Sequence, residues 1–357
     1  MWAKGEYRGS TYRNNADLHA WLAKSSPETA LEPDLPIIDP HHHFWSSQER
    51  GTYLLPELLA DIGGGHNIVS TVFVECRAMY RAEGPAEMRP VGEIEFVNGL
   101  AAMSASGGFG PCRIAEGIVG HADLTLGARV RDVLEAEIAA GGGRMRGIRY
   151  SVPWDASEIG KYVSRFVKPH QLMAPDFREG FAQLARLRLS YDCWLYFPQI
   201  PELTDLARAF PDTTIILDHV GGMLNVGPYA GRQAEILKSW GADIAELAKC
   251  PNVNVKIGGI GMINLGFDFH EREAPAPSTE LAAAWRPYVE RCIEAFGPAR
   301  CMFESNFPPD KQSCGYSELW NAFKHLTTGA SAAEKRALYS GTAARVYRRR
   351  PPGHVVR

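Results

Sequence analysis

The sequence predicts an α/β protein built as a (β/α)8 barrel, or TIM barrel, with a short N-terminal extension and extra helices at the C-terminus. Eight short apolar segments, rich in β-branched residues and bounded by glycine or proline, are typical of strands. Amphipathic segments of helical length separate most of them, and this alternation implies parallel strands. Most strand segments are too uniformly apolar to have a solvated face, which favours a closed barrel over an open sheet.

The elements follow one another in a regular order. The strand segments are LPIID (35–39), STVFVEC (70–76), AEGIVGH (115–121), MRGIRYSV (145–152), SYDCWLYF (190–197), TTIILDH (213–219), NVNVKIGG (252–259) and RCMFES (300–305). Helices are expected over 128–140, 177–189, 201–210, 234–250 and 280–296. The segment LLPELLADIG (54–63) is a poor helix, and it is the weakest part of the barrel prediction.

Two more helices are expected after the last strand, over 316–329 and 331–348. The second begins with Ser331 and has Glu334 three residues later, which is a capping-box pattern. Long connections rich in glycine and proline follow the second, fourth and seventh strands, over 77–93, 153–176 and 259–277. They leave the barrel at its C-terminal face, where barrel enzymes place their active sites. Residues 1–34 are expected to form an N-terminal arm, and residues 35–357 the barrel domain.

Composition excludes several classes of function. The 357 residues are 45% hydrophobic and 22% charged, and no apolar run approaches the roughly 18 residues of a membrane span. The net charge of -3 argues against nucleic-acid binding. Seven scattered cysteines without a CxxC pair, and an N-terminus without a signal-peptide core, fit a cytoplasmic protein. The sequence does not decide between a monomer and a homo-oligomer.

Polar side chains gather where the predicted strands end, so we expect them to meet around one pocket. A small, anionic substrate would suit a pocket so rich in arginine and histidine. The residues concerned, in chain order, are Asp39, His41, His42, His43, Glu75, Arg77, His121, Asp123, Arg146, Arg149, Tyr196, Gln199, Asp218, His219, Lys256, Glu304, Asn306 and Asp310.

Side-chain alternation separates the three consecutive histidines. On an extended chain His41 and His43 point to one side and His42 to the other, so we expect the first two in the pocket and His42 in the scaffold. His219 follows a buried strand and precedes two glycines that allow close approach of a ligand. It is the third histidine that we expect in the pocket.

The basic residues of the predicted strands, Arg146, Arg149 and Lys256, can each be interpreted as functional or as structural. Arg146 and Arg149 lie three apart and point to opposite faces, so one of them should face the pocket. There it would bind a substrate carboxylate, or else form an internal ion pair with Glu75 or Asp123. Lys256 is costly to bury unpaired, so it is either functional or paired with an acid of a neighbouring strand.

Six segments between residues 35 and 348 resemble the motifs of one family, in the same order. They are IIDPHHHFW, for a D-x-H-x-H-x-W opening, GIVGHADL, RGIRY, PQIPELTDLARAFPDTTIILDHVGG, NVNVKIGGI and FGPARCMFESNFP. This pattern is similar to the amidohydrolase superfamily, in the branch of amidohydrolase-related (amidohydrolase 2) barrel hydrolases with fuconolactonase, pyrone-dicarboxylate lactonase and sulfomuconolactonase. The resemblance implies the barrel fold and hydrolase chemistry.

The resemblance also implies roles for individual residues. His41, His43 and His219 would surround the electrophilic carbonyl. The family's strand-eight aspartate, a water-activating base or metal ligand, maps to Asn306, which cannot accept a proton at neutral pH. At strand five, where metal-dependent members often have a histidine, this chain has Tyr196.

These two departures favour catalysis without a tightly bound metal, because a catalytic divalent site needs about three protein ligands. No cofactor is therefore expected. Zinc remains the leading alternative, and its ligands would then be drawn from His41, His43, Glu75 and Glu304.

The sequence thus predicts a hydrolase of a lactone or similar cyclic ester, which acts by water attack on a carbonyl polarised by histidines. The catalytic candidates are His41, His43, His219, Asn306, Asp310 and Glu75, with the general base open among Glu75, Glu304 and Asp310. The substrate-binding candidates are Arg77, Arg146, Arg149, Tyr196, Gln199 and Lys256. The alternatives are a zinc-dependent decarboxylase or amide hydrolase, and a non-catalytic ligand-binding relative.

Overall fold

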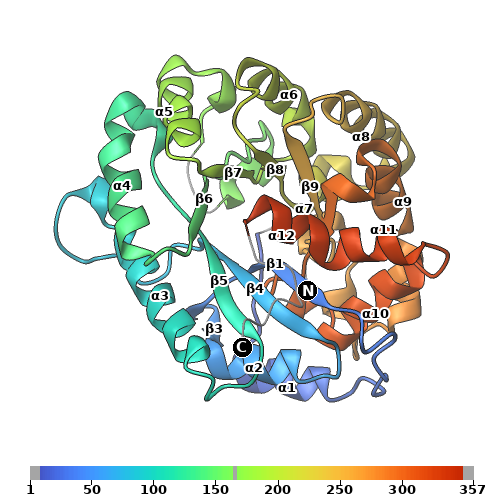
Figure 1. Ribbon diagram of the computed structural model, residues 1–357. Coiled ribbons are helices and arrows are strands. Elements are labelled where there is room, and N and C mark those ends of the chain that lie inside the picture. Colours follow the sequence, from blue (N-terminus) through green and yellow to red (C-terminus); the bar gives the residue numbers. More distant parts are fainter. Residues whose placement is uncertain (1–8, 164–166, 349–357) are drawn as a thin grey trace.

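The structure is a computed structural model that describes residues 9–163 and 167–348. Eight parallel strands form a barrel with helices around it (Figure 1). The strands pair in chain order, and each expected strand segment overlaps one of them. They are β1 (Ile37–His42), β4 (Ile68–Val74), β5 (Arg113–Gly120), β6 (Met145–Arg149), β7 (Ser190–Cys193), β8 (Ile215–Leu217), β9 (Val253–Ile257) and β10 (Cys301–Phe303).

The barrel closes between the end of β1 and the residues that follow β10. The backbone N–H of Asn306 donates to the carbonyl of His41 at 2.9 Å, and that of His43 donates to the carbonyl of Phe307 at 2.8 Å. His42 and Phe307 also form a parallel bridge. Closure therefore places the histidines of β1 beside Asn306.

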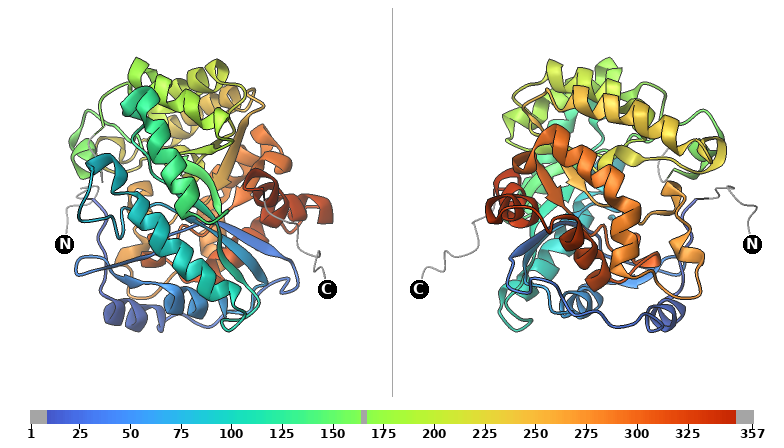
Figure 2. Two further views of the ribbon diagram at one scale, coloured as in Figure 1. Left: turned by 60° about the vertical axis from the view of Figure 1, so that its left-hand side comes forward. Right: turned by 90° about the vertical axis from the view of Figure 1, so that its right-hand side faces the viewer.

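Helices cover the outside of the strands, as the two side views in Figure 2 show. The five expected helices between strands are confirmed with small shifts of their ends, and so is the Ser331–Glu334 capping box. The expected last helix is divided by a π-type turn over Ala337–Gly341. The confirmed helices are α4 (Val130–Ala140), α5 (Pro175–Arg186), α6 (Ile200–Ala209), α8 (Gln233–Leu247), α9 (Ser278–Phe296), α10 (Tyr316–Leu326), α11 (Ala332–Arg336) and α12 (Thr342–Val346).

Three elements differ from the expectation. The doubtful segment after β1 is a regular helix, α2 (Leu55–Ile62), whose first turn tolerates proline and is capped by the Glu57 carboxylate, which accepts from the N–H of Leu54 at 2.8 Å. A hairpin of β2 (Trp45–Ser47) and β3 (Gly51–Tyr53) precedes it. Helix α3 (Val91–Ala105) starts inside the segment expected to be a loop. Its sequence did not indicate a helix, because its apolar residues do not repeat on one face.

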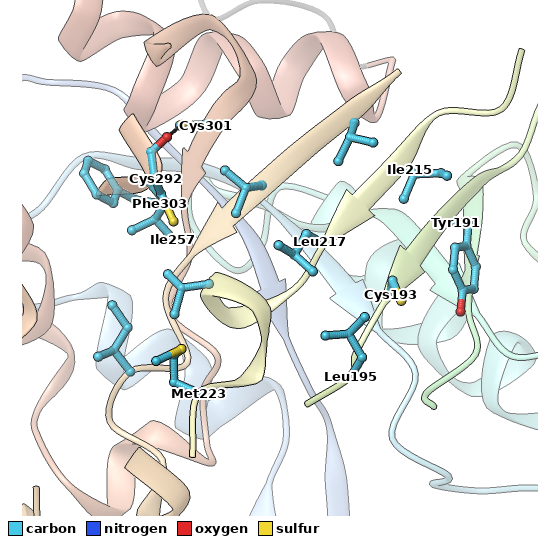
Figure 3. Packing of buried hydrophobic residues seen from close by; sticks show 14 of the residues in the cluster. Tyr191, Cys193, Leu195, Ile215, Leu217, Met223, Ile257, Cys292, Cys301 and Phe303 are labelled. Carbon is cyan, nitrogen blue, oxygen red and sulfur yellow. Dashed lines mark hydrogen bonds between the residues drawn. The ribbon is translucent and has the colours of Figure 1, made fainter. Parts of the chain in front are cut away.

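The hydrophobic core has two layers. The larger one lies between the strands and the surrounding helices, and Figure 3 shows part of it around β7, β8 and β9. The smaller one fills the barrel, where Ile38, Val72 and Ile216 pack toward Tyr347. Tyr347 follows α12, which closes the N-terminal end of the barrel. The open C-terminal end is left for the site.

In residues 9–34, the described part of the N-terminal arm, there is one short helix, α1 (Asn15–Leu22). Its Asn14 cap accepts from the N–H of Asp17 at 2.9 Å. Among the described residues, no helix is both long enough and apolar enough to cross a membrane.

Candidate active site

A pocket of about 180 Å³ opens at the C-terminal ends of the strands. Its inner surface brings together residues that closely follow β1, β4, β7 and β8, the last residue of β6, and the segment after β10. Among the predicted site residues it contains His43, Glu75, Arg77, Arg149, Tyr196, His219 and Asn306.

The β1 histidines alternate as expected. The rings of His41 and His43 lie 4.9 Å apart, and the ring of His41 lies 4.6 Å from that of His219. His42 points to the other side, where its Nε2 lies 2.8 Å from the Thr71 hydroxyl and its ring packs on Phe44. His42 is therefore part of the scaffold, while His41 lies fully buried directly beneath the pocket.

A backbone carbonyl fixes the tautomer of His43. Its Nδ1 lies 2.8 Å from the carbonyl of Val74, which can only accept, so Nδ1 carries the hydrogen. Burial and the charge of Arg149 hold the pKa of His43 well below the usual range. A neutral imidazole with hydrogen on Nδ1 has its lone pair on Nε2. His43 thus offers a proton acceptor, whereas the sequence suggested a group that polarises a carbonyl.

His219 and Glu304 form a buried dyad. The Glu304 Oε1 lies 2.7 Å from Nδ1 of His219 and 3.3 Å from its backbone nitrogen, which donates to it. Burial lowers the pKa of His219 to about 3. With Nδ1 turned to the carboxyl group, Nε2 is the nitrogen left for the pocket that His219 lines.

The backbone that follows β9 packs directly against the side chains of this dyad. A Cβ at Gly259 would meet the ring of His219 at 2.5 Å, and a Cβ at Gly258 would meet Cγ of Glu304 at 2.3 Å. Glycine at these two positions therefore lets the β9 backbone touch both side chains.

Three pocket residues have left-handed backbones. The φ angles are 65° at Arg77, 55° at His219 and 51° at Asn306. Such conformations cost on the order of 1 kcal/mol or more outside glycine and are concentrated at functional sites. They occur here just after three different strands, where each turns a side chain into the pocket.

Arg149 faces the pocket and Arg146 does not. The Arg149 Nε donates to Glu75 Oε1 at 3.0 Å, and its Nη1 lies 3.2 Å from Nε2 of His41. Arg146 lies on the outer side of β6, where its Nη1 donates to the carbonyl of Gly143 at 2.7 Å. The prediction of Arg146 as a substrate-binding residue is therefore corrected, because strand alternation sends it away from the pocket.

Lys256 lies in a buried charge network below the pocket. Its Nζ donates to Asp192 at 2.6 Å, lies 3.3 Å from Asp218, and lies 3.2 Å from Nδ1 of His41. Asp192 also accepts from the Tyr347 hydroxyl at 2.6 Å. Lys256 is thus paired with Asp192 of β7, two strands away, and with Asp218, which follows the neighbouring β8. It reaches the site through His41 rather than by lining the pocket.

Asp310 holds Asn306 in place. Its Oδ1 accepts from the Asn306 amide at 2.8 Å, and its Oδ2 accepts from the N–H of Gly261 at 2.8 Å. Asp310 is buried, and desolvation raises the pKa of its carboxyl group to about 8. It is therefore a positioning residue for Asn306, which lines the pocket itself.

This raised pKa predicts a pH dependence of stability. A carboxyl group with a pKa near 3.8 unfolded and about 8 folded stabilises the protein fully below about pH 4, and this contribution is lost as the pH rises through 8. We expect the free energy of unfolding of the wild type to fall between pH 5 and pH 8 by a few kcal/mol more than that of Asp310→Asn. Urea titrations at both pH values measure this difference. An equal change in the free energy of unfolding between pH 5 and pH 8 in the two proteins would contradict the prediction.

Three buried side chains could hold a divalent metal ion: His41, His219 and Glu304, whose ligand atoms lie within 4.8 Å of one another. Two imidazoles and a carboxylate match the preference of zinc. The Oε2 of Glu304 has no hydrogen-bond partner and lies 2.8 Å from Nδ1 of His41. A cation between these two atoms would be bound by both. The donor set therefore fits, although the Lys256 and Arg149 cations beside His41 oppose tight binding.

This set differs from the predicted zinc ligands. His43 keeps a lone pair on Nε2 but does not belong to this set, and Glu75 is paired with Arg149. His219 takes their place because its strand end adjoins Glu304.

One more predicted site residue supports the fold instead of lining the pocket. Several residues that line the pocket were not predicted from the sequence. Gln199 is buried and binds the backbone of Val152 and Trp154, so its predicted contact with substrate is corrected. Tyr196 lines the pocket as predicted. The residues missed include Asp192, a polar residue inside an apolar strand, and the pocket-lining Ser10, Tyr12, Trp45, Arg50, Cys76 and Trp194.

Comparisons with known proteins agree with this architecture. A family model described as amidohydrolase matches residues 38–349. The uncharacterized protein y4mH of Sinorhizobium fredii is 34% identical over 336 residues, which cover 88% of this chain and 99% of that one. An L-fucono-1,5-lactonase of Burkholderia multivorans is 26% identical over 87% of this chain and 95% of its own. A crystal structure of an amidohydrolase from Burkholderia multivorans with bound zinc has a TM-score of 0.64 at 24% identity, over 88% and 99% of the two chains.

Proposed function

Because this chain belongs to the amidohydrolase family and is a hydrolase, we propose that it opens the ring of a lactone that carries a carboxylate. The observation that carries the proposal is the buried His219–Glu304 dyad, whose free imidazole nitrogen adjoins a pocket lined by arginine. A neutral imidazole next to guanidinium groups suits water attack on the ester of an anionic substrate.

The proposed proton acceptor is Nε2 of His219. Glu304 holds the hydrogen of this imidazole on Nδ1, so Nε2 can take a proton from water as the water oxygen attacks the lactone carbonyl. The same proton then passes to the ring oxygen as the acyl–oxygen bond breaks, and a hydroxy acid leaves. This assignment replaces the three carboxylates expected as bases, since each of them is held by a partner.

Arg149 is the proposed donor to the carbonyl oxygen. Its guanidinium lines the pocket, and its bonds to Glu75 and His41 leave a hydrogen on Nη1 for a ligand. A fixed cation at this place stabilises the negative charge that forms on the carbonyl oxygen during attack. Asn306, held by Asp310, supplies an amide group to orient the attacking water.

When bound, a divalent metal ion held by His41, His219 and Glu304 would polarise the carbonyl and lower the pKa of water. We expect this occupancy to be low, because two buried cations lie 3.2 Å from the nitrogens of His41. Protein purified without chelator should contain well under one equivalent of zinc by elemental analysis. Stoichiometric zinc that resists dialysis would contradict this prediction.

The reaction is tested with a panel of lactones, each in a carboxylated and a neutral form of equal ring size. We expect hydrolysis of at least one carboxylated lactone, with kcat/KM at least about tenfold above its neutral counterpart, from the ion pair that Arg149 can form. Ring opening is followed by release of acid at constant pH. If no lactone is opened faster than by the His219→Ala protein, the proposed reaction is wrong.

A further inference from the structure

The outer wall of the pocket comes from two segments that precede α2. Ser10 and Tyr12 of the N-terminal arm line it, and so do Trp45 and Arg50 of the β2–β3 hairpin. The family match begins at residue 38, so the arm lies outside it. The arm adds to this pocket a wall that the matched part of the chain does not supply.

The arm is fixed to the barrel on both sides of its helix start. The Asn15 side-chain amide donates to the carbonyl of Thr52 at 2.7 Å and accepts from its N–H at 2.8 Å, as a strand neighbour would. The backbone N–H of Arg13 donates to the Gln312 side chain at 2.9 Å, and its Nη1 donates to the Gln312 carbonyl at 3.0 Å. These anchors immediately follow Tyr12, so its position in the pocket wall is determined.

Arg50 is a half-buried cation in this wall. Its guanidinium carbon lies 4.5 Å from the centre of the Trp45 ring, and the Tyr12 ring meets the same indole edge-on at 5.7 Å. Within the described part of the chain, no carboxylate forms an ion pair with Arg50. A guanidinium that is stacked on an aromatic ring keeps its hydrogen-bond donors for an anion.

The charges around this wall also favour an anion. The described lining holds three arginines, Arg50, Arg77 and Arg149, against one acid, Glu75, which is itself paired with Arg149. The pocket therefore has positive charge at its outer wall as well as at the reacting centre.

We propose that Tyr12, Trp45 and Arg50 form a second anion subsite, in which Arg50 binds a carboxylate remote from the reacting ester and Tyr12 and Trp45 hold Arg50 in place. The substrate class is then a polycarboxylate rather than a neutral sugar. The inference deepens the proposed function and rests on it only for the reaction, since the subsite itself is defined by binding.

Calorimetric titration with isophthalate, a planar dicarboxylate, tests the subsite without turnover. Isophthalamide is the neutral control ligand. We expect the wild type to bind isophthalate at least tenfold more tightly than the diamide, and Arg50→Gln to lose most of this preference. Arg131→Gln, which changes an exposed arginine on α4, should bind as the wild type does. Tyr12→Ala and Asn15→Ala should weaken the binding of isophthalate, while Tyr12→Phe should not.

The outcomes separate the subsite from the reaction. No preference of the wild type for isophthalate, or unchanged preference in an Arg50→Gln protein that melts at the wild-type temperature, would overturn the subsite. Arg50→Lys, which restores charge without the planar fork, should recover part of the preference. A protein that binds isophthalate through Arg50 but opens no lactone keeps the subsite and loses the proposed reaction.

Discussion

Replacing His219 with alanine is expected to lower kcat about 10³-fold, within the range of 10²–10⁴ that a positioned acid–base group contributes. The variant loses the only nitrogen that Glu304 orients toward the pocket, so water is no longer deprotonated as it attacks. KM should change less, because the arginines that bind the substrate remain. Steady-state kinetics on the best lactone of the panel gives both values.

Two comparisons make this test specific. His170→Ala removes an exposed histidine that pairs with Glu202, and it should leave kcat unchanged. Added imidazole should partly restore the rate of His219→Ala, because it fills the vacated space with the missing base. A kcat within threefold of the wild type, or no response to imidazole at any concentration, would assign the proton transfer to another group.

Replacing Lys256 with methionine is expected to lower the free energy of unfolding by about 3–5 kcal/mol, the cost of breaking a buried ion pair by removing one partner. Asp192 and Asp218, both fully buried, lose the cation that lies 2.6 Å and 3.3 Å from them. Burial raises the pKa of Asp218 to about 6, so this carboxyl group can be protonated at pH 5 instead. The loss should therefore be larger at pH 8 than at pH 5.

Urea unfolding at the two pH values measures this effect. The matched control is Lys161→Met, which removes an exposed lysine 2.8 Å from Glu158 and should leave the free energy of unfolding nearly unchanged. Equal losses in the two lysine variants, or a larger loss at pH 5, would contradict the role assigned to the buried network. Tyr347→Phe should show a smaller loss of the same pH dependence, since it removes one donor to Asp192.

Local periodicity was sufficient to predict the barrel and the directions of the β1 histidines. Strand alternation separates His42 from its neighbours in the sequence and in the structure alike. It also requires that only one of Arg146 and Arg149 face inward, but the pattern does not say which, because that depends on the pairing of β6 with both neighbouring strands.

Partners that are distant in the sequence could not be predicted. Asp192 sits in an apolar strand, and only barrel closure shows that it pairs with Lys256 across the interior. The tautomer of His43 depends on the carbonyl of Val74 on another strand, so the free lone pair on its Nε2 is visible only in three dimensions. The place of Tyr12 in the pocket depends in the same way on anchors at Thr52 and Gln312.

The two glycines at the end of β9 bear on how substrate preference can diverge. Any side chain at Gly258 or Gly259 would displace Glu304 or His219, so the pocket cannot be reshaped at these two positions without losing the dyad. The arm and the hairpin have no such constraint, since they hold no part of the dyad. New substrates are therefore more accessible to this protein through changes in residues 10–12 and 45–50 than through changes in the barrel.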